Sequence, residues 1–293
     1  MKERKLLRNI FLTVFVVLTL TNIVFLYVAF SIEHTTWLGL FLAITFALLE
    51  TTIIVILNTY YNDLLKIVGK NTVRTIRLEN LNHPLLLKLS NIAPGTYNHS
   101  LNVAQLSTKA AKSIGLDEGF IRIGAYFHDI GKLRNPKIFN ENGIGRDLKT
   151  DDLKKTSRQI IDHVTYGQKL AREYNLPDEA IEYISQHHGS SEIYSLKNKS
   201  NGKNIIAQYP GPKPLTRQAA ILMLADSVEA RVKGLKVTSD ENITRAIESE
   251  FTNKLKDGQL EYSGLSVFEI KKIKESFQGT MNAIYHRRKI KNG

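Results

Sequence analysis

A histidine followed directly by an aspartate, His128-Asp129, ends an apolar stretch that is typical of a buried helix. The stretch starts at Gly124, reads Gly-Ala-Tyr-Phe before the pair, and continues as Ile-Gly-Lys to Lys132. An imidazole and a carboxylate in an apolar interior are costly unless something binds them. A metal ion meets this need, and it requires further ligands from elsewhere in the chain.

Other histidines and a second aspartate supply such ligands. The chain has eight histidines, and the candidate metal ligands are His99, His128, Asp129, His163, His187, His188 and Asp226. This set is large enough for two ions. Side chains that are adjacent on a helix point about 100° apart, so neither adjacent pair can chelate one ion as an i, i+4 pair does. They can instead hold two ions that lie close together, with Asp129 as the bridging ligand.

The ligand types limit the metals and the chemistry. Cysteine is absent, which excludes thiolate ligands, a cysteine nucleophile and disulfides. Imidazole and carboxylate ligands favour iron or manganese, with cobalt and zinc as alternatives. Two ions about 3.5–4 Å apart can lower the pKa of a bridging water and stabilise the attacking and leaving oxygens on phosphorus. A single histidine would more often be a core or surface residue, whereas the whole set indicates a site.

The first sixty residues are mostly apolar, and the rest of the chain is strongly polar. Residues 10–30 and 37–57 each have the length of a membrane-spanning helix. Lysines and arginines precede the first run and follow the second, and residues 31–36 contain neither, so both termini are expected in the cytoplasm. The first run is too long for the apolar part of a signal peptide. Glu50 lies in the second run, where it should be protonated or hydrogen-bonded.

The net charge of +12 suits an anionic partner. Lysines and arginines are spread along the chain rather than packed in one block, so no nucleic-acid polymer is expected as a partner. Anionic lipid beside a cytosolic domain and an anionic substrate account for the charge.

The polar part of the chain predicts an all-α fold, because it shows little period-two alternation. Helices are expected over residues 98–114, over 117–129, over 153–164 continuing to 174, over 177–188 and over 217–233, followed by two helices around the turn at Asp257-Gly258. Residues 135–152 and 190–214 are expected to be loops. The predicted domains are a membrane hairpin (residues 1–60), a helical connector (61–81) and a cytosolic domain (82–293).

Several short motifs resemble one family. The order of the ligand candidates is similar to that of the HD-domain metal-dependent phosphohydrolases, in the two-metal version with extra histidines. The short motifs around these candidates resemble those of the seven-transmembrane, PgpH-type branch of this family. They are Ala-Pro-Gly-Thr-Tyr-Asn-His-Ser from Ala93, His-Asp-Ile-Gly-Lys from His128, Gln-His-His-Gly from Gln186, Tyr-Pro-Gly-Pro-Lys-Pro from Tyr209, Leu-Ala-Asp-Ser-Val-Glu-Ala from Leu224 and Asp-Gly-Gln from Asp257. The resemblance covers about residues 80–290.

The resemblance implies an HD-domain helical bundle that hydrolyses cyclic di-AMP to pApA with a hydroxide activated by two divalent ions. It assigns one ion to His99, His128, Asp129 and Asp226, and the other to Asp129, His163, His187 and His188. Asp129 and Lys132 are the implied catalytic residues. Lys132 would contact the phosphate that is cut, and Lys213 and Arg231 are further candidates for substrate contacts.

Other interpretations of the function stay open at this point. An HD enzyme could act on cyclic di-GMP or on another nucleotide with the same metals. A non-catalytic receptor could bind the nucleotide and signal through its connector helix. The family has seven spans and a large extracellular domain, whereas this sequence shows two runs, as a short natural form or a fragment would. The six residues between the runs are too few to form an extracellular ligand-binding domain. A homodimer is one option for the oligomeric state.

The charge pattern around the two apolar runs predicts the topology of the chain in the cell membrane. Reporter fusions at Met1 and at Gly293 should both report the cytoplasm, because the flanking lysines and arginines stay on that side. A fusion at Glu33, between the runs, should report the outside. An external C-terminus would exclude this topology, since it would separate the candidate site from cytoplasmic nucleotides.

Overall fold

The computed structural model describes residues 78–143, 153–193 and 208–291, together with scattered positions between residues 19 and 56. The two predicted membrane runs lie, apart from those positions, outside the described residues, and so does most of the predicted connector. Among the described residues, no helix is both long and apolar enough to cross a membrane. The chain divides into two compact units, Met1–Arg74 and Thr75–Gly293.

The second unit is built from helices, which confirms the predicted all-α fold class. The α-helices are α3 (Pro84–Ile92), α4 (Pro94–Ser113), α5 (Gly119–Phe127), α6 (Leu153–Glu173), α7 (Asp178–Gln186), α9 (Arg217–Lys233), α10 (Asp240–Lys256) and α11 (Val267–Lys291). Three short 3-10 helices follow α5: η1 (Ile130–Arg134), η2 (Pro136–Ile138) and η3 (Asn140–Asn142). Extended pairing within the described residues is limited to an isolated bridge between Glu192 and Gln208.

Local signals set most of the helix ends. Helix α4 begins at Pro94 rather than at Asn98, because a proline suits the first turn, where its missing N–H needs no partner. Gly115 follows this helix with φ of 75°, a conformation that glycine adopts without strain. Thr216 caps α9 and Ser239 caps α10, each accepting a hydrogen bond from a backbone N–H three residues later.

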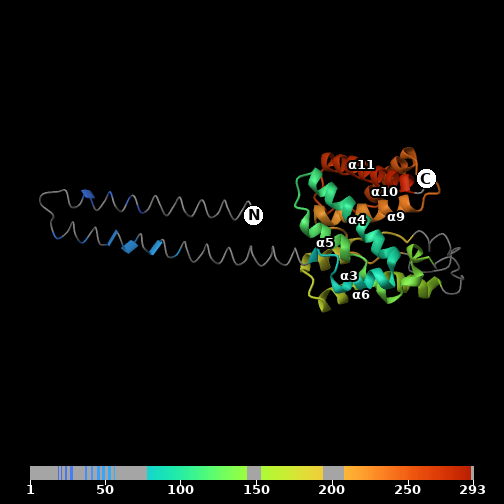
Figure 1. The fold of residues 1–293 in the computed structure, drawn as a ribbon, viewed down its shortest axis with the longest axis horizontal. Helices are drawn as coiled ribbons and strands as arrows, with labels where there is room; N and C mark the ends of the chain where they lie inside the picture. Colours follow the sequence, from blue (N-terminus) through green and yellow to red (C-terminus); the bar gives the residue numbers. More distant parts are fainter. Residues whose placement is uncertain are drawn as a thin grey trace. The chain divides into compact units, whose positions relative to one another are not determined.

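Helix α4 is the central element of the bundle. It contacts α3, α5, α9 and α11, while α10 packs on α9 and α11. Figure 1 shows α9, α10 and α11 together on one side of α4, with α3 and α6 on the other. Helix α9 is buried around most of its circumference, because it lies between α4 and α10.

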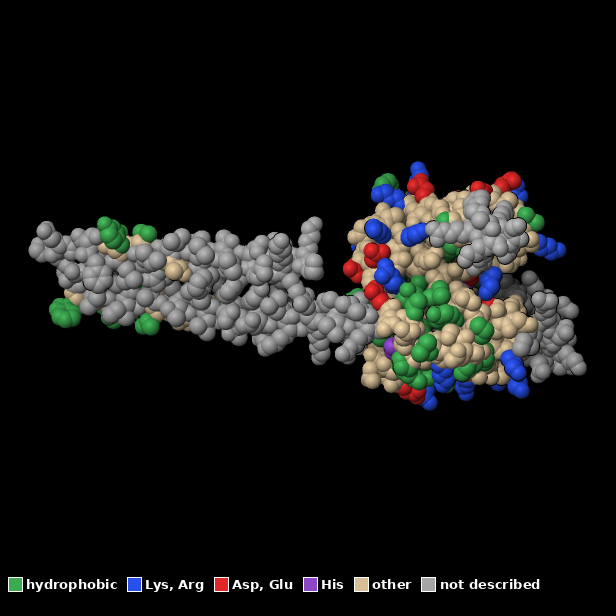
Figure 2. Space-filling model, viewed as in Figure 1, with side chains coloured by type: hydrophobic (Ala, Val, Ile, Leu, Met, Phe, Trp, Pro, Cys, Tyr) green, Lys and Arg blue, Asp and Glu red, His purple; other side chains and the backbone are tan. Residues whose placement is uncertain are grey.

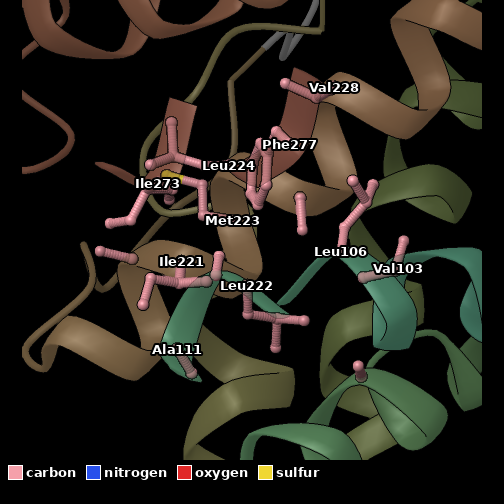
Figure 3. Close-up of a cluster of buried hydrophobic side chains, with 14 of the residues drawn as sticks. Val103, Leu106, Ala111, Ile221, Leu222, Met223, Leu224, Val228, Ile273 and Phe277 are labelled. Carbon is pink, nitrogen blue, oxygen red and sulfur yellow. The ribbon is translucent and has the colours of Figure 1, made fainter. Parts of the chain in front are cut away.

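Two apolar clusters hold the helices together. The larger one joins side chains of α4, α5, α9, α10 and α11, and Figure 3 shows Leu106, Leu222 and Phe277 among its members. The second joins α3, α5, η1, α6 and α7 around Phe127, Ile130 and Ile184. Helix α5 contributes to both clusters, and its C-terminal end carries the His128-Asp129 pair. The fold therefore places that pair deep in the bundle.

The turn after Asp129 fits closely against α6. A Cβ atom added at Gly131 would lie 1.7 Å from the carbonyl oxygen of His163 and 2.7 Å from the backbone nitrogen of Gly167. Both contacts are with backbone, which cannot move aside as a flexible side chain could. Glycine at this position is what allows η1 to bring Asp129 against the helix that carries His163.

We expect Gly131→Ala to destabilise the protein by about 3 kcal/mol or more, because η1 and α6 must separate to admit the methyl group. Gly279→Ala is the matched control, since a Cβ at this position of α11 would meet no heavy atom within 4 Å. That control should be neutral or gain up to about 1 kcal/mol from the better helix propensity of alanine. Urea denaturation followed by circular dichroism measures both. Equal stability of the two variants would contradict the close packing of η1 on α6.

Candidate metal centre

The structure brings all seven predicted ligand residues together from five helices. His99 lies on α4, His163 on α6 and Asp226 on α9. The remaining four follow the C-terminal ends of helices: His128 and Asp129 come after α5, and His187 and His188 come after α7. The seven residues form two groups that share Asp129.

Three histidine rings are oriented by the same kind of hydrogen bond, from the ring to a backbone carbonyl three residues earlier. The Nδ1 atoms of His128 and His187 lie 2.8 Å from the carbonyl oxygens of Ala125 and Ile184, and His163 makes the corresponding bond to Ile160. A carbonyl oxygen only accepts hydrogen bonds, so Nδ1 must carry the proton in each ring. The lone pair is then on Nε2, which points into the centre. The preceding helical turn thus fixes both the tautomer and the ring orientation.

The two carboxylate oxygens of Asp129 face different groups of histidines. Oδ2 lies 3.3 Å from Nε2 of His128 and 3.6 Å from Nε2 of His99. Oδ1 lies 3.4 Å from Nε2 of His163 and 3.6 Å from Nε2 of His187. Ligand atoms that surround one ion at bonds of about 2.1 Å are themselves about 3–3.5 Å apart. The spacing on each side of Asp129 is therefore that of a ligand shell.

Unpaired polar atoms support the fit of cations to this centre. His128 Nε2 and both carboxylate oxygens of Asp129 are buried and have no hydrogen-bond partner. Buried polar atoms without partners are rare in folded proteins, and each calls for an explanation such as an ion. The nearest cation is the Lys132 ammonium, whose Nζ lies 2.7 Å from Asp129 Oδ2 as an ion pair without hydrogen-bond geometry. The cluster is compatible with divalent metal ions.

The ionisable side chains of the centre differ in the direction in which their pKa values are shifted. Burial alone would raise the pKa of Asp129, but Lys132 and His128 hold it well below its usual value. Burial lowers the pKa of His163 to about 4, and it also lowers that of His188. His99 is the opposite case: burial would lower its pKa, but hydrogen bonds to Asp226 and Glu229 raise it to about 10. Ionised carboxylates and neutral imidazoles are the forms that bind metals.

His99 has a buried carboxylate behind it that the sequence did not indicate. Glu229 Oε2 lies 2.5 Å from Nδ1 of His99, and Asn102 donates to Oε1 of Glu229 at 2.8 Å. Nε2 of His99 faces Asp226 at 2.9 Å. A carboxylate behind a ligating histidine fixes the ring and increases its basicity. Glu229 lies three residues after Asp226 on α9, so a helical projection from Asp226 would have placed it on a nearby face.

Lys132 is held in place from two sides. Its Nζ lies 2.8 Å from Oε1 of Glu141, and it stands over the ring of Phe139 at 4.8 Å. Glu141 in turn accepts a hydrogen bond from Thr96 at 3.0 Å, which joins η3 to the first turn of α4. Part of the predicted loop 135–152 is thus ordered into η2 and η3 beside the site. This arrangement fixes the lysine next to Asp129.

A cavity of about 780 Å³ opens beside the ligand residues. Of the three residues that the resemblance implied for substrate contacts, Lys132 and Arg231 line this cavity, whereas Lys213 is not among its lining residues. The ammonium of Lys213 lies 3.4 Å from Oε2 of Glu261. Tyr209 also lines the cavity and stacks on His188, with ring centroids 4.1 Å apart. The motif that begins at Tyr209 therefore reaches the site through its tyrosine rather than its lysine.

Comparison with known proteins identifies the domain that contains these residues. The HD domain family matches residues 96–231. Cyclic-di-AMP phosphodiesterase PgpH of Bacillus subtilis (strain 168) is 38% identical over 225 residues, which cover 74% of this chain and 32% of that protein. The protein of the same name from Listeria monocytogenes serotype 1/2a (strain 10403S) is 36% identical over 224 residues. The chain spans about a third of the length of the curated relatives it matches.

Solved structures show the same fold. The crystal structure of the L. monocytogenes phosphodiesterase PgpH HD domain matches with a TM-score of 0.67 and 34% identity, covering 70% of this chain and all of that one. The structure of that domain in complex with cyclic-di-AMP matches with a TM-score of 0.65 at 34% identity, covering 70% of this chain and 98% of that one.

Proposed function

This chain belongs to the HD-domain family, and from that premise we propose that it is a dimetal phosphodiesterase that opens cyclic di-AMP to pApA. The observation that carries the proposal is the placement of Asp129. Its two buried oxygens lack hydrogen-bond partners and face separate groups of imidazoles. One carboxylate between two ligand sets is the arrangement required for a pair of bridged cations.

In this proposal the seven predicted residues hold the two ions. His99, His128 and Asp226 serve one ion, His163, His187 and His188 serve the other, and Asp129 serves both. Iron or manganese suits these ligands best, with cobalt or zinc as alternatives. When bound, two divalent cations lower the pKa of a water between them and stabilise the charge that develops on phosphorus.

The protein's own residues position the substrate and balance its charge. Lys132 already lies beside Asp129, so its ammonium is placed to donate to a non-bridging oxygen of the phosphate that is cut. Glu141 keeps the lysine there and accepts its hydrogen bond. The apolar clusters include the helix that carries His128 and Asp129, and these two side chains are almost fully shielded from water, which strengthens the electrostatic interactions that they make.

The choice of substrate rests on the relatives. The structure of the L. monocytogenes domain is a complex with cyclic-di-AMP, and the cavity here is within the size range of small-molecule sites. Cyclic di-GMP and other nucleotides stay as alternatives, because the metal chemistry would be the same. A non-catalytic receptor is less well supported, since it would not need the buried lysine beside the bridging carboxylate. Figure 2 shows lysines and arginines together with carboxylates on the visible face of the helical unit.

We also propose that residues 10–30 and 37–57 anchor the enzyme in the cell membrane as a multi-pass hairpin. The support is the length of the two apolar runs and the charges that flank them. Reporter fusions at the termini and at Glu33 test this topology.

The substrate assay uses the full 293-residue chain in detergent, loaded with Mn²⁺. We expect cyclic di-AMP to give pApA with little AMP, because the opened dinucleotide must shift before its second phosphodiester reaches the metals. The substrates to be compared are cyclic di-AMP, cyclic di-GMP and a panel of nucleotides, and chromatography identifies the products formed from each. Lys132→Ala should lower turnover strongly while it retains both metals. Faster cleavage of cyclic di-GMP at equal metal content would move the assignment to that substrate.

The bridging role of Asp129 gives a sharper test of the two-metal site. Asp129→Ala removes the one ligand that both groups share and leaves two cations with less negative charge between them. Metal content should fall at both positions, and turnover should fall by several powers of ten. His163→Ala should lower the occupancy of one position only, because it belongs to one group.

Elemental analysis of metal per chain, circular dichroism and the hydrolysis rate are measured together for the wild type and both variants. The helices should survive in each variant, since the apolar clusters contain neither residue. Two metals per chain and ordinary turnover in Asp129→Ala would rule out the bridging carboxylate and the mechanism built on it.

A further inference from the structure

The cavity beside the metal centre has a second basic wall, formed by α9 and α10, which the proposed chemistry at the metals does not use. Arg231, Lys233 and Lys254 line it. Arg231 has a carboxylate neighbour, because its Nε lies 4.0 Å from Oε1 of Glu250, and about half of its side chain is exposed. Lys254 instead donates to a neutral group, the hydroxyl of Ser191, at 2.7 Å.

The ammonium of Lys254 is poorly compensated. Burial lowers its pKa, and Asp226, Glu250 and Asp257 act on it only through space. In the described part of the chain, no carboxylate oxygen lies within ion-pair distance of its Nζ. The charge of Asp226 would be shared with a metal ion in the loaded enzyme, which would leave Lys254 with less compensation still. A partly buried ammonium in a cavity wall is therefore a place where an anion would be stabilised.

A cyclic dinucleotide supplies such an anion. Its ring contains two phosphodiester groups, each with one negative charge, on opposite sides of the ring. When one of them lies at the metals and Lys132, the other must face a different part of the cavity. Lys254 has three N–H groups, and its bond to Ser191 uses one of them. The other two are left for an anion in the cavity that Lys254 lines.

We propose that Lys254 binds the phosphate that is not being cut, and so selects substrates that carry a second phosphodiester. This inference rests on the proposed function, because it takes a cyclic dinucleotide as the ligand. Lys254 would act on substrate binding rather than on the chemical step, since its hydrogen bond is to Ser191 and not to a ligand residue of the cluster.

The test measures KM and kcat for cyclic di-AMP with the full Mn²⁺-loaded chain. Lys254→Gln should raise KM about tenfold or more, the effect of losing a charged hydrogen bond, while kcat stays within about threefold of the wild type. Lys254→Arg should recover most of the affinity, because it keeps the positive charge. Metal content per chain should be the same in all of these proteins.

Two controls separate phosphate binding from a structural role. Ser191→Ala removes the acceptor of the Lys254 hydrogen bond but keeps the ammonium, so KM should change much less than in Lys254→Gln. Lys256→Gln removes an exposed lysine from the same helix and tests for a loss of general charge attraction. The proposal is overturned by an unchanged KM in Lys254→Gln, by an equal rise in Ser191→Ala or Lys256→Gln, or by a fall in kcat that matches the rise in KM.

Failure of the proposed function has a different signature. In that case the wild type would not cleave cyclic di-AMP at all, and isothermal titration with this dinucleotide would decide the role of Lys254. About tenfold weaker binding in Lys254→Gln than in the wild type would support it. Equal binding by the two proteins, or no binding by the wild type, would refute it.

Discussion

A buried carboxylate without hydrogen-bond partners is the constraint on which the rest of this structure depends. Asp129 is 1% exposed, and neither of its oxygens accepts a hydrogen bond. Such a group is costly in an apolar interior unless cations compensate it. Lys132 provides part of that compensation in the described structure, and His128 provides a further part. The converging imidazoles around Asp129 have a clear purpose only if metal ions provide the remainder.

The two apolar clusters stabilise the fold around this polar centre and hold its residues in place. One cluster joins α9, α10 and α11 to α4, the other joins α3, α6 and α7 to η1, and α5 belongs to both. Ligand residues lie on or directly after helices of each cluster, so the packing of the whole bundle sets the distances between them. Because helix-bound carbonyls fix three of the rings, their orientation is set by the fold itself.

The cavity beside the site is lined in part by residues outside the ligand cluster. Among them, Tyr209 stacks on the ring of His188, and Lys254 donates a hydrogen bond to the Ser191 hydroxyl at 2.7 Å. Under the proposed function, the metals and Lys132 would serve the phosphate that is cut, while Arg231 and Lys254, which also line the cavity, would face the rest of the ligand. Differences in substrate between related enzymes would then be expected at such cavity-lining residues.

The sequence by itself determined the helical class of the fold, most helix boundaries and the set of seven candidate ligands, because helix periodicity, caps and the chemistry of buried histidines are local properties. Tertiary structure alone decided which groups assist those residues. Glu229 reaches His99 across 130 positions of sequence, and Thr96 reaches Glu141 across 45. It also decided that Lys213 pairs with Glu261 outside the cavity while Lys254 lines it. Such contacts depend on how helices pack against one another, and no local pattern in the sequence encodes that packing.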